Sequence, residues 1–270
     1  MQKSSKLETL SLQFHFAGDG LGSELATLFK ENKTLTSIML GNNDLTSKAI
    51  EHLKEQKTKD VFLEKLDLRF NAKLKAEGAL HLAEFMKKCP RLTFLNLKDC
   101  KIGSTGLKSM SPVLRASTTL TELNLERNDL GVRGAIQLSQ CLVVNRSLEK
   151  IKLKCNAIVY SGMLAILRSL NHHPCINQLL MECNSIEFNE ENVVYAANCM
   201  ALNKSLKMID FSHNSIKPDE DAIKNSGFEV LQRKVHDDGW QQLQRGVFKR
   251  IVSKMYLLCA CEEGSRCNYI

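Results

Sequence analysis

The stretch Leu120-Thr-Glu-Leu123-Asn-Leu125-Glu-Arg-Asn128-Asp-Leu130 decides the fold, because the chain repeats its opening pattern, L-x-x-L-x-L, eight times. The intervals between copies are 28, 28, 29, 28, 28, 28 and 30 residues. The copies open at Leu7, Leu35, Leu63, Leu92, Leu120, Leu148, Ile176 and Leu206. Self-similarity at this period predicts stacked units, none of which can bury its apolar face alone.

Each copy predicts a short strand that ends in a turn. Leu123 and Leu125 are two residues apart, so they point to one face of a strand while Asn124 and Glu126 point to the other. The amide of Asn128 can satisfy backbone groups where the chain leaves the strand, so stacked copies should form an asparagine ladder. The same position holds Asn43, Asn71, Asn156, Asn184 and Asn214, with His15 in the first unit and Cys100 in the fourth.

The second half of each unit predicts a helix. From Gly134 to Leu142 the apolar residues are spaced by two, three and four, which suits an amphipathic helix lying against the strands. Gly78, Gly106 and Gly162 occur at the same phase as Gly134. At this phase we expect helix and strand backbones to approach closely.

The whole pattern resembles the ribonuclease-inhibitor type of leucine-rich repeat, L-x-x-L-x-L-x-x-N-x-L followed by G-x-x-x-L. The resemblance covers residues 7–216 and implies a curved α/β solenoid, or horseshoe, of about eight repeats. A parallel sheet would line its concave side, helices its convex side, and a helical cap its C-terminal end. We therefore divide the chain into a repeat array over 1–216, a cap with a basic amphipathic helix over 217–258, and a flexible cysteine-containing tail over 259–270.

Composition limits the class of protein. The sequence has no run of 18 apolar residues and begins without the apolar stretch of a secretory signal, so we expect a cytoplasmic protein with reduced cysteines. Cys100, Cys141 and Cys155 lie at repeat positions, where we expect small buried thiols. The net charge of +7 is modest and the aromatic residues do not recur in phase, so nucleic-acid binding is not expected.

The sequence offers little for catalysis or metal binding. His172-His173-Pro174-Cys175 is the one tight cluster of metal-ligand residue types, but no second pair accompanies it, so we interpret it as a loop. Nucleophile-elbow, phosphate-loop and zinc-protease motifs are missing, and we expect neither a cofactor nor an enzyme. The resemblance leaves one catalytic alternative, a GTPase-activating type of regulator, although its residues cannot be placed on this sequence.

A partner would lie on the concave face, which the outward strand positions form. Lys150, Lys152 and Lys154 occupy one rung, with Glu122 and Glu126 on the rung before it. The lysines therefore either pair with these glutamates, leaving a merely soluble face, or form a binding patch with charge-coded specificity. We predict a monomer that binds a protein partner through Arg69, Lys98, Lys150, Lys152, Lys154 and Leu180.

The C-terminal segment predicts membrane attachment. An apolar stripe that includes Trp240 accompanies four basic residues, Arg245, Lys249, Arg250 and Lys254, as in an interfacial helix or an outer cap of the array. Cys267, fourth from the end, resembles a C-a-a-X prenylation signal, although Asn268 and Tyr269 are not aliphatic. Cys259 and Cys261 lie where such tails often carry palmitate.

We therefore expect a non-catalytic scaffold that a prenyltransferase modifies and that the tail holds on the cytoplasmic face of a membrane. The sequence leaves open whether it is a native eukaryotic adaptor or a microbial effector that uses the prenylation machinery of a host.

Overall fold

The computed structural model describes residues 6–58, 60–171, 173–188, 196, 199–200 and 202–216 of the chain. Strands and helices alternate along most of this length. The strands are β1 Thr9–Ser11, β2 Ser37–Met39, β3 Lys65–Asp67, β4 Phe94–Asn96, β5 Glu122–Asn124, β6 Lys150–Lys152, β7 Gln178–Leu180, β8 Glu187–Phe188, β9 Met208–Asp210 and β10 Ser215–Ile216. The helices are α1 Gly20–Glu31, α2 Ser47–Glu55, α3 Lys75–Met86, α4 Gly103–Ala116, α5 Gly131–Leu142 and α6 Val159–Leu170.

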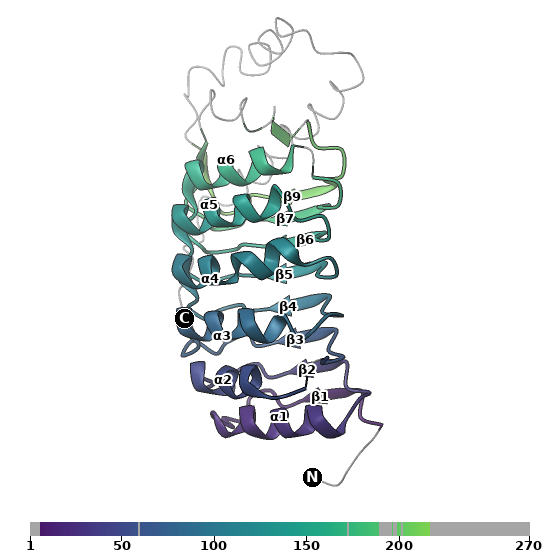
Figure 1. The fold of residues 1–270 in the computed structure, drawn as a ribbon. Helices are drawn as coiled ribbons and strands as arrows, with labels where there is room; N and C mark the ends of the chain where they lie inside the picture. Colours follow the sequence, from purple (N-terminus) through teal and green to yellow (C-terminus); the bar gives the residue numbers. More distant parts are fainter. Residues whose placement is uncertain are drawn as a thin grey trace, which may run out of the picture.

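The elements stack as a solenoid with one sheet and one layer of helices (Figure 1). The sheet has eight strands in the order β1-β2-β3-β4-β5-β6-β7-β9, and all neighbours are parallel and in register from repeat to repeat. The helices α1 to α6 stack in the same order along the other side of the molecule (Figure 1). This arrangement confirms the predicted α/β leucine-rich-repeat solenoid with its parallel sheet.

Leucines of the repeat pattern fill the space between the two layers. Leu120, Leu123 and Leu125 of the fifth repeat are at most 1% exposed, and Leu130 and Leu138 complete that layer from the turn and the helix. Each fully buried leucine stabilises the fold by roughly 1.5–3 kcal/mol relative to an exposed one. Because the same positions recur in every repeat, the core is one continuous column rather than eight separate ones.

The asparagine ladder is present, as predicted. The backbone N–H groups of Asn128 and Leu130 donate to Oδ1 of Asn156, at 3.0 and 3.4 Å. Asn156 in turn donates through Nδ2 to the carbonyl of Leu125 in the preceding repeat, at 2.8 Å. Asn43, Asn71, Asn184 and Asn214 make equivalent bonds across their own junctions. Each amide therefore ties its turn to the strand of the preceding repeat.

The ladder is interrupted between the third and fourth repeats. Cys100 replaces the asparagine of the fourth repeat, and the third repeat has one extra residue, which makes it 29 residues long. The Cys100 thiol donates to the carbonyl of Leu68 at 3.1 Å and so replaces the donor half of an asparagine. The extra residue in the turn after Asn71 lets Leu74 N–H donate to the carbonyl of Asn71, at 3.0 Å. In the second repeat the equivalent residue, Leu45, donates to an asparagine amide of the next repeat. In the altered turn the Leu74 N–H thus finds its acceptor within its own repeat instead of at position 100.

A second set of turn acceptors lies three residues before the opening residue of several repeats. Oδ1 of Asn145 accepts the backbone N–H groups of Ser147 and Leu148, both at 2.9 Å. Asn32 and Asn203 do the same in their own repeats. This row was not predicted from the sequence, although asparagine recurs at its spacing.

The in-phase glycines serve a different contact from the one expected. A Cβ atom on Gly106 would lie 2.5 Å from Cγ2 of Ile102 and 3.0 Å from Cβ of Ala79 in α3. A Cβ atom on Gly162 would lie 2.7 Å from Cγ2 of Ile158 and 2.9 Å from Cβ of Ala135 in α5. Gly106 and Gly162 therefore allow close approach between neighbouring helices, whereas Cβ atoms on Gly78 and Gly134 would meet only the side chains of Leu74 and Leu130. None of the four meets a strand among its nearest neighbours, so the expectation of a helix-to-strand approach was wrong.

The seventh and eighth repeats add a feature that the pattern does not predict. Residues of β8 and β10 pair in parallel as a separate two-stranded sheet, Glu187 with Ser215 and Phe188 with Ile216. The predicted cap with its basic helix over 217–258 and the predicted tail over 259–270 lie outside the described residues.

Candidate protein-binding face

The outward side chains of the sheet form three columns along the molecule. They come from the second, fourth and sixth residues after the opening residue of each repeat, and we call this surface the strand face. The fifth repeat contributes Glu122, Asn124 and Glu126, and the sixth contributes Lys150, Lys152 and Lys154. All the protein-binding residues predicted from the sequence belong to these columns.

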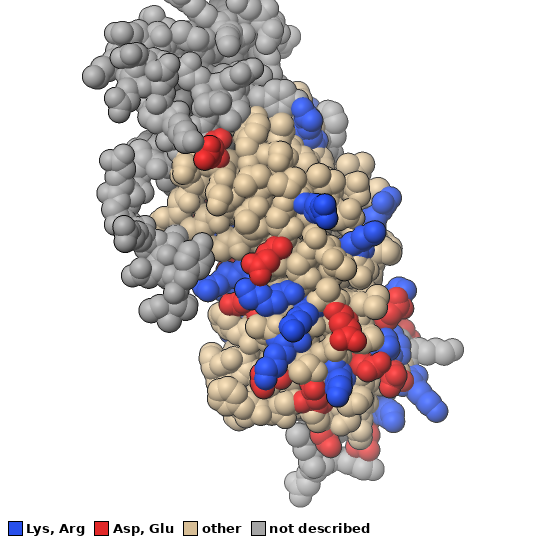
Figure 2. Space-filling model, turned by 90° about the vertical axis from the view of Figure 1, so that its left-hand side faces the viewer, with Lys and Arg blue, Asp and Glu red and all other residues tan. Residues whose placement is uncertain are grey.

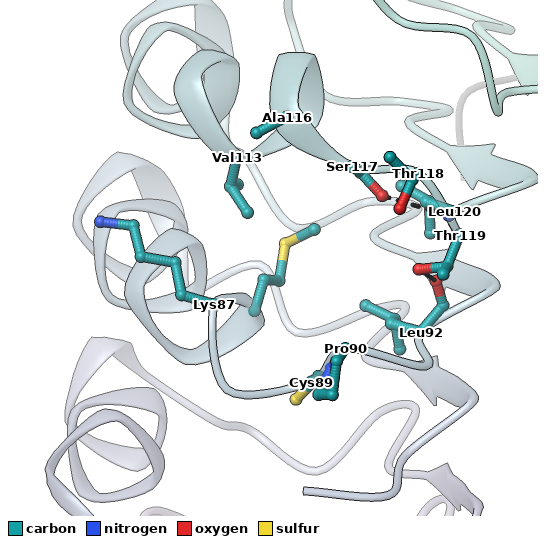
Figure 3. Close-up of a pocket in the computed structure, with 11 residues that line it drawn as sticks. Lys87, Cys89, Pro90, Leu92, Val113, Ala116, Ser117, Thr118, Thr119 and Leu120 are labelled. Carbon is teal, nitrogen blue, oxygen red and sulfur yellow. Dashed lines mark hydrogen bonds between the residues drawn. The ribbon is translucent and has the colours of Figure 1, made fainter. Parts of the chain in front are cut away.

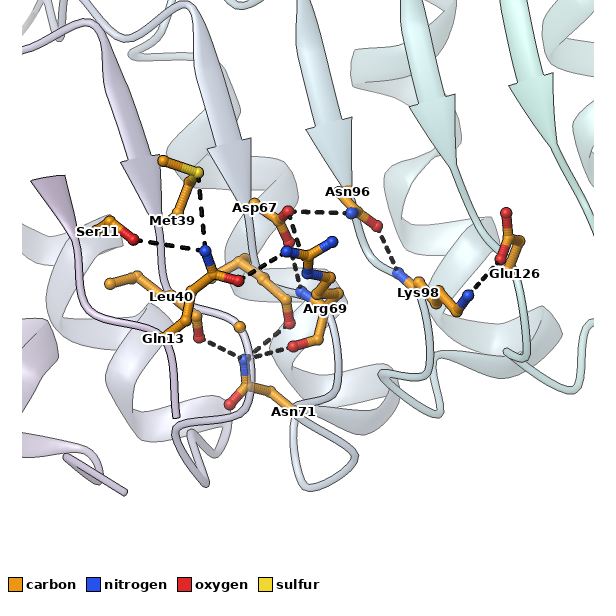
Figure 4. A network of polar contacts seen from close by, with 12 residues as sticks. Ser11, Gln13, Met39, Leu40, Asp67, Arg69, Asn71, Asn96, Lys98 and Glu126 are labelled. Atoms are coloured by element: carbon orange, nitrogen blue, oxygen red, sulfur yellow. Dashed lines mark hydrogen bonds and ion pairs between the residues drawn. The ribbon is translucent and has the colours of Figure 1, made fainter. Parts of the chain in front are cut away.

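Arg69 is held in a polar network that spans the first four repeats (Figure 4). Its Nη2 atom donates to Oε1 of Gln13 at 2.7 Å, and its Nε atom lies 3.5 Å from Oδ2 of Asp67. Asn96 donates through Nδ2 to the same Asp67 oxygen, at 3.1 Å. Between Arg69 and Gln13 lies Gly41, where a Cβ atom would come within 3.0 Å of the Arg69 side chain. A glycine on the intervening repeat therefore lets the arginine reach two repeats back.

Lys98 is also engaged. Its ammonium lies 2.8 Å from Oε2 of Glu126 and 5.7 Å from the ring centroid of Phe70, a cation–π distance. Lys98 and Arg69 thus hold partners within the described part of the chain, and a ligand would have to compete for them. The sequence placed both on this face but did not identify Gln13, Gly41 or Phe70 as their surroundings.

The three lysines of the sixth repeat differ from one another. Lys152 pairs with Glu122, with Nζ and Oε1 separated by 2.8 Å. Lys150 is the register partner of Glu122 across β5 and β6, yet the carboxylate is already bound to Lys152. Within the described residues neither Lys150 nor Lys154 makes an ion pair. The self-pairing alternative therefore holds for Lys152 and not for the other two lysines.

The seventh repeat completes this region with Leu180 and Glu182. Leu180 is half-buried and lies beside Lys152, its register partner. Burial raises the pKa of Glu182, and the nearby carboxylates of Asp210 and Glu126 raise it further, while Lys154 acts in the opposite direction. Oε2 of Glu182 is buried without a hydrogen-bond partner in the described structure. At this end of the strand face, Lys150, Lys154 and Glu182 thus make no ion pair with another described residue.

Three polar residues of the middle column are more buried than expected for a binding surface. Asp67, Asn96 and Asn124 are 5–6% exposed. The Oδ1 atoms of all three accept the backbone N–H two residues later, at 3.0 or 3.1 Å. These side chains shape the ends of β3, β4 and β5, and the signal that could have identified them is the recurrence of Asp or Asn after the strand leucine.

A notch of about 320 Å³ lies between the C-terminal ends of α3 and α4 (Figure 3). Val113, Leu92 and Met86 supply apolar surface, and two of its hydroxyl groups are already hydrogen-bonded. Thr119 Oγ1 donates to the carbonyl of Leu92 at 3.0 Å, and Ser117 Oγ accepts the N–H of Leu120 at 3.1 Å. The notch therefore presents no group poised for chemistry.

Within the histidine cluster, His173 and Cys175 form hydrogen bonds in a turn, and His172 lies outside the described residues. His173 is buried, and its Nδ1 atom accepts the N–H groups of Cys175 and Ile176, at 3.3 and 3.1 Å. The Cys175 thiol donates to the carbonyl of Arg146 at 3.0 Å. The described residues contain no group of three or more histidine, cysteine, aspartate or glutamate side chains arranged to hold a metal.

The remaining cysteine predictions have mixed outcomes. Cys100 and Cys141 are buried, as expected, but Cys155 is only half-buried, so its assignment as a core thiol was wrong. Its position follows the strand rather than lying between the layers, which is why it reaches the surface. The predicted lipidation sites Cys259, Cys261 and Cys267, and the basic residues Arg245, Lys249, Arg250 and Lys254, lie outside the described residues.

Charge on the surface is mixed rather than segregated. On the side shown in Figure 2, lysine and arginine lie next to aspartate and glutamate over much of the lower half. Lys73 with Asp44, at 2.7 Å, and Lys87 with Glu84, at 2.7 Å, are exposed pairs of this kind. Such pairs contribute little to stability, typically 0–1 kcal/mol by order of magnitude.

Comparison with known proteins agrees with this geometry. A family model described as "Leucine Rich repeat" matches residues 60–83, 88–111 and 116–139, which span the third, fourth and fifth repeats. The chain contains leucine-rich repeats. Outside these three stretches the repeats are recognised by their strands, turns and helices in the structure. Assignment to the ribonuclease-inhibitor type continues to rest on the sequence pattern.

Among solved structures, the chain is similar to the leucine-rich repeat-containing protein LegL7 from Legionella pneumophila. It is 15% identical, with 87% of this chain and 92% of that chain covered and a TM-score of 0.41. The complex of Rad7 and Elc1 from yeast is 14% identical, with 78% and 64% covered and a TM-score of 0.42. No curated protein matches the sequence.

Proposed function

We propose that this leucine-rich-repeat chain is a non-catalytic scaffold that binds a protein segment on its strand face, at the sixth and seventh repeats. The observation that carries the proposal is that only one of the three lysines of the sixth repeat, which lie on β6 and just after it, makes an ion pair. Lys152 is paired, whereas Lys150 and Lys154 make no ion pair within the described residues. A partner carboxylate at these positions would gain charge-assisted hydrogen bonds without breaking an existing pair.

Leu180 supplies an apolar contact beside these charges. An interface needs some apolar area at its centre and a polar rim, and a half-buried leucine whose register neighbours are Lys152 and Asp210 provides both on a small scale. Specificity would come from Glu126, Glu182 and Asp210, which repel an acidic partner that binds out of register. We therefore expect a partner segment with acidic residues spaced to meet Lys150 and Lys154.

The experiment compares two double charge reversals of the full-length protein. Lys150→Glu/Lys154→Glu alters the strand face, and Lys48→Glu/Lys108→Glu makes the same change in net charge on α2 and α4, where both lysines are exposed. Partners captured from cells by the wild type and by the helix variant, but lost with the strand-face variant, support the proposal. Recovery of the same partners by both variants, at the same salt dependence, contradicts it.

We further propose that the tail attaches the scaffold to the cytoplasmic face of a membrane. The support is in the sequence: Cys267 is fourth from the end, Cys259 and Cys261 precede it, and the basic stripe adds attraction to anionic lipids. Within the described residues, no helix has the length and apolar character needed to cross a bilayer.

A GTPase-activating activity is the alternative function, and stimulation of nucleotide hydrolysis by catalytic amounts of the protein would replace the scaffold proposal.

A further inference from the structure

Two cysteines occupy equivalent positions in neighbouring repeats, at the edge of the strand face. The seventh residue after the opening residue is Cys155 in the sixth repeat and Cys183 in the seventh. Their backbone φ angles are 54° and 52°, so the two side chains leave the chain from the same left-handed conformation. Both residues are half-buried.

The backbone holds these two positions next to each other. The N–H of Cys155 donates to the carbonyl of Glu182, the residue before Cys183, at 3.0 Å. The hydrogen-bonded ladder of β6 and β7 therefore continues as far as the cysteines, where neighbouring chains lie about 4.8 Å apart. A disulfide spans Cα atoms that are about 4.4–6.8 Å apart. The spacing suits a bond between Cys155 and Cys183.

Other described cysteines are unsuited to this chemistry. Burial raises the thiol pKa of Cys89 and Cys100 to about 12, and raises those of Cys141 and Cys199 as well. Buried thiols that stay protonated do not attack disulfides, because the thiolate is the nucleophile. Cys175 is half-buried but lies before its strand, at the opposite end of the repeat from Cys155 and Cys183.

We propose that Cys155 and Cys183 form a dithiol that a low-molecular-weight disulfide oxidises reversibly. One cysteine thiolate attacks a sulfur of the small disulfide, whose S–S bond breaks and releases one small thiolate. The second cysteine thiolate then attacks the protein sulfur of this mixed disulfide, forming the Cys155–Cys183 bond and releasing the second small thiolate. The two protons lost by the cysteines pass to the leaving thiolates. The protein loses two electrons, and the small disulfide gains them.

The bond would form with some strain. Side chains stacked on parallel neighbours keep their Cβ atoms near the strand spacing of about 4.8 Å, whereas a relaxed disulfide needs about 3.8 Å. Strained, accessible disulfides are the readily reduced ones, so this pair should switch rather than stay oxidised. The switch would link the sixth and seventh repeats next to Lys154 and Glu182, where the proposed partner binds.

Peptide mapping of the full-length protein tests the proposal. Reduced protein is incubated with glutathione disulfide, alkylated, and cleaved after lysine, arginine and glutamate. Cleavage after Lys154, Arg168, Glu182 and Glu187 leaves Cys155 in peptide 155–168 and Cys183 in peptide 183–187. We expect these two peptides to be joined, with a loss of about 2 Da from their summed mass, and to separate after dithiothreitol.

Two variants sharpen the result. Cys155→Ser should leave Cys183 as a mixed disulfide with glutathione, because the resolving thiol is missing. Cys175→Ser removes a half-buried thiol elsewhere and should leave the linked peptides unchanged. Linkage to a different cysteine, or glutathione adducts on both Cys155 and Cys183 in the wild type without their joining, would overturn the proposal.

Discussion

His173 shows at the residue scale how one side chain takes over a turn that asparagine makes in other repeats. Its Nδ1 atom accepts two backbone N–H groups, as Oδ1 does in Asn145 and Asn203. The ring proton must then lie on Nε2, which is buried without a hydrogen-bond partner in the described structure. Burial, helped by the Arg146 charge, lowers the His173 pKa to about 4. An asparagine would accept the same two N–H groups and would not bury the unpaired Nε2–H group of the histidine ring.

We predict that His173→Asn stabilises the protein, and more so at pH 5 than at pH 8. An unfolded histidine takes up a proton near pH 6.5, whereas the folded one resists until about pH 4, so the wild type loses stability as the pH falls through this window. Asparagine does not titrate, and the gain at pH 5 should be about 1–2 kcal/mol larger than at pH 8.

Urea unfolding of both proteins at the two pH values measures this difference. Equal pH dependence for the wild type and the variant would mean that His173 is protonated in the folded protein and that the assigned tautomer is wrong.

At the element scale, small residues set how closely successive helices stack. Gly106 in α4 faces Ala76 and Ala79 of α3, and Gly162 in α6 faces Ala135 of α5. At these two junctions a small residue of one helix therefore meets a small residue of the preceding helix. Larger side chains would push the helices apart while the strands stay at their fixed hydrogen-bonding distance.

We predict that Gly106→Ala destabilises the protein by about 1–3 kcal/mol, although alanine favours helix more than glycine does. The added Cβ atom meets Cγ2 of Ile102 at 2.5 Å and Cα of Ala76 at 3.1 Å, and both lie close to the backbone. Gly20→Ala is the matched control, because nothing lies within 4 Å of its Cβ position. It should change the free energy of unfolding by no more than about 0.5 kcal/mol. Equal effects of the two substitutions in urea unfolding would refute the close-packing explanation.

The strands and turns could be predicted from the sequence because the same residues recur at the same positions in every repeat. The spacing of Leu123 and Leu125 places a strand, and Asn128 places the turn, in every copy at once. Side-chain partners were not predictable, because stacking gives each charge two equivalent neighbours. Glu126 has Lys98 on one side and Lys154 on the other, and in the structure it pairs with Lys98. Side-chain rotamers decide this choice, and the repeat pattern does not encode them.

At the scale of the whole molecule, the strand face has two parts. In the first repeats the polar side chains bind one another, whereas in the sixth and seventh repeats few of the charged side chains are paired. Gln13, Asp67, Arg69, Asn96 and Lys98 satisfy one another across the first repeats of the sheet. Such a network resists rearrangement, since breaking one contact leaves a partly buried charge without its partner. The sixth and seventh repeats have no comparable network among the described residues, which is why we place the partner there.

We propose that the tail determines where this face meets its partner, and Cys267→Ser tests that role. An isoprenoid adds about 0.8 kcal/mol of membrane affinity per buried CH₂, yet a single chain attaches only marginally, so the basic stripe or acylation of Cys259 and Cys261 must add to it. We expect wild-type protein from eukaryotic cells to sediment with membranes and Cys267→Ser to stay soluble, with unchanged partner binding at the strand face. Intact mass of the wild type gives an independent readout. An unmodified mass together with a soluble wild type would remove the membrane from this account and leave the scaffold proposal standing.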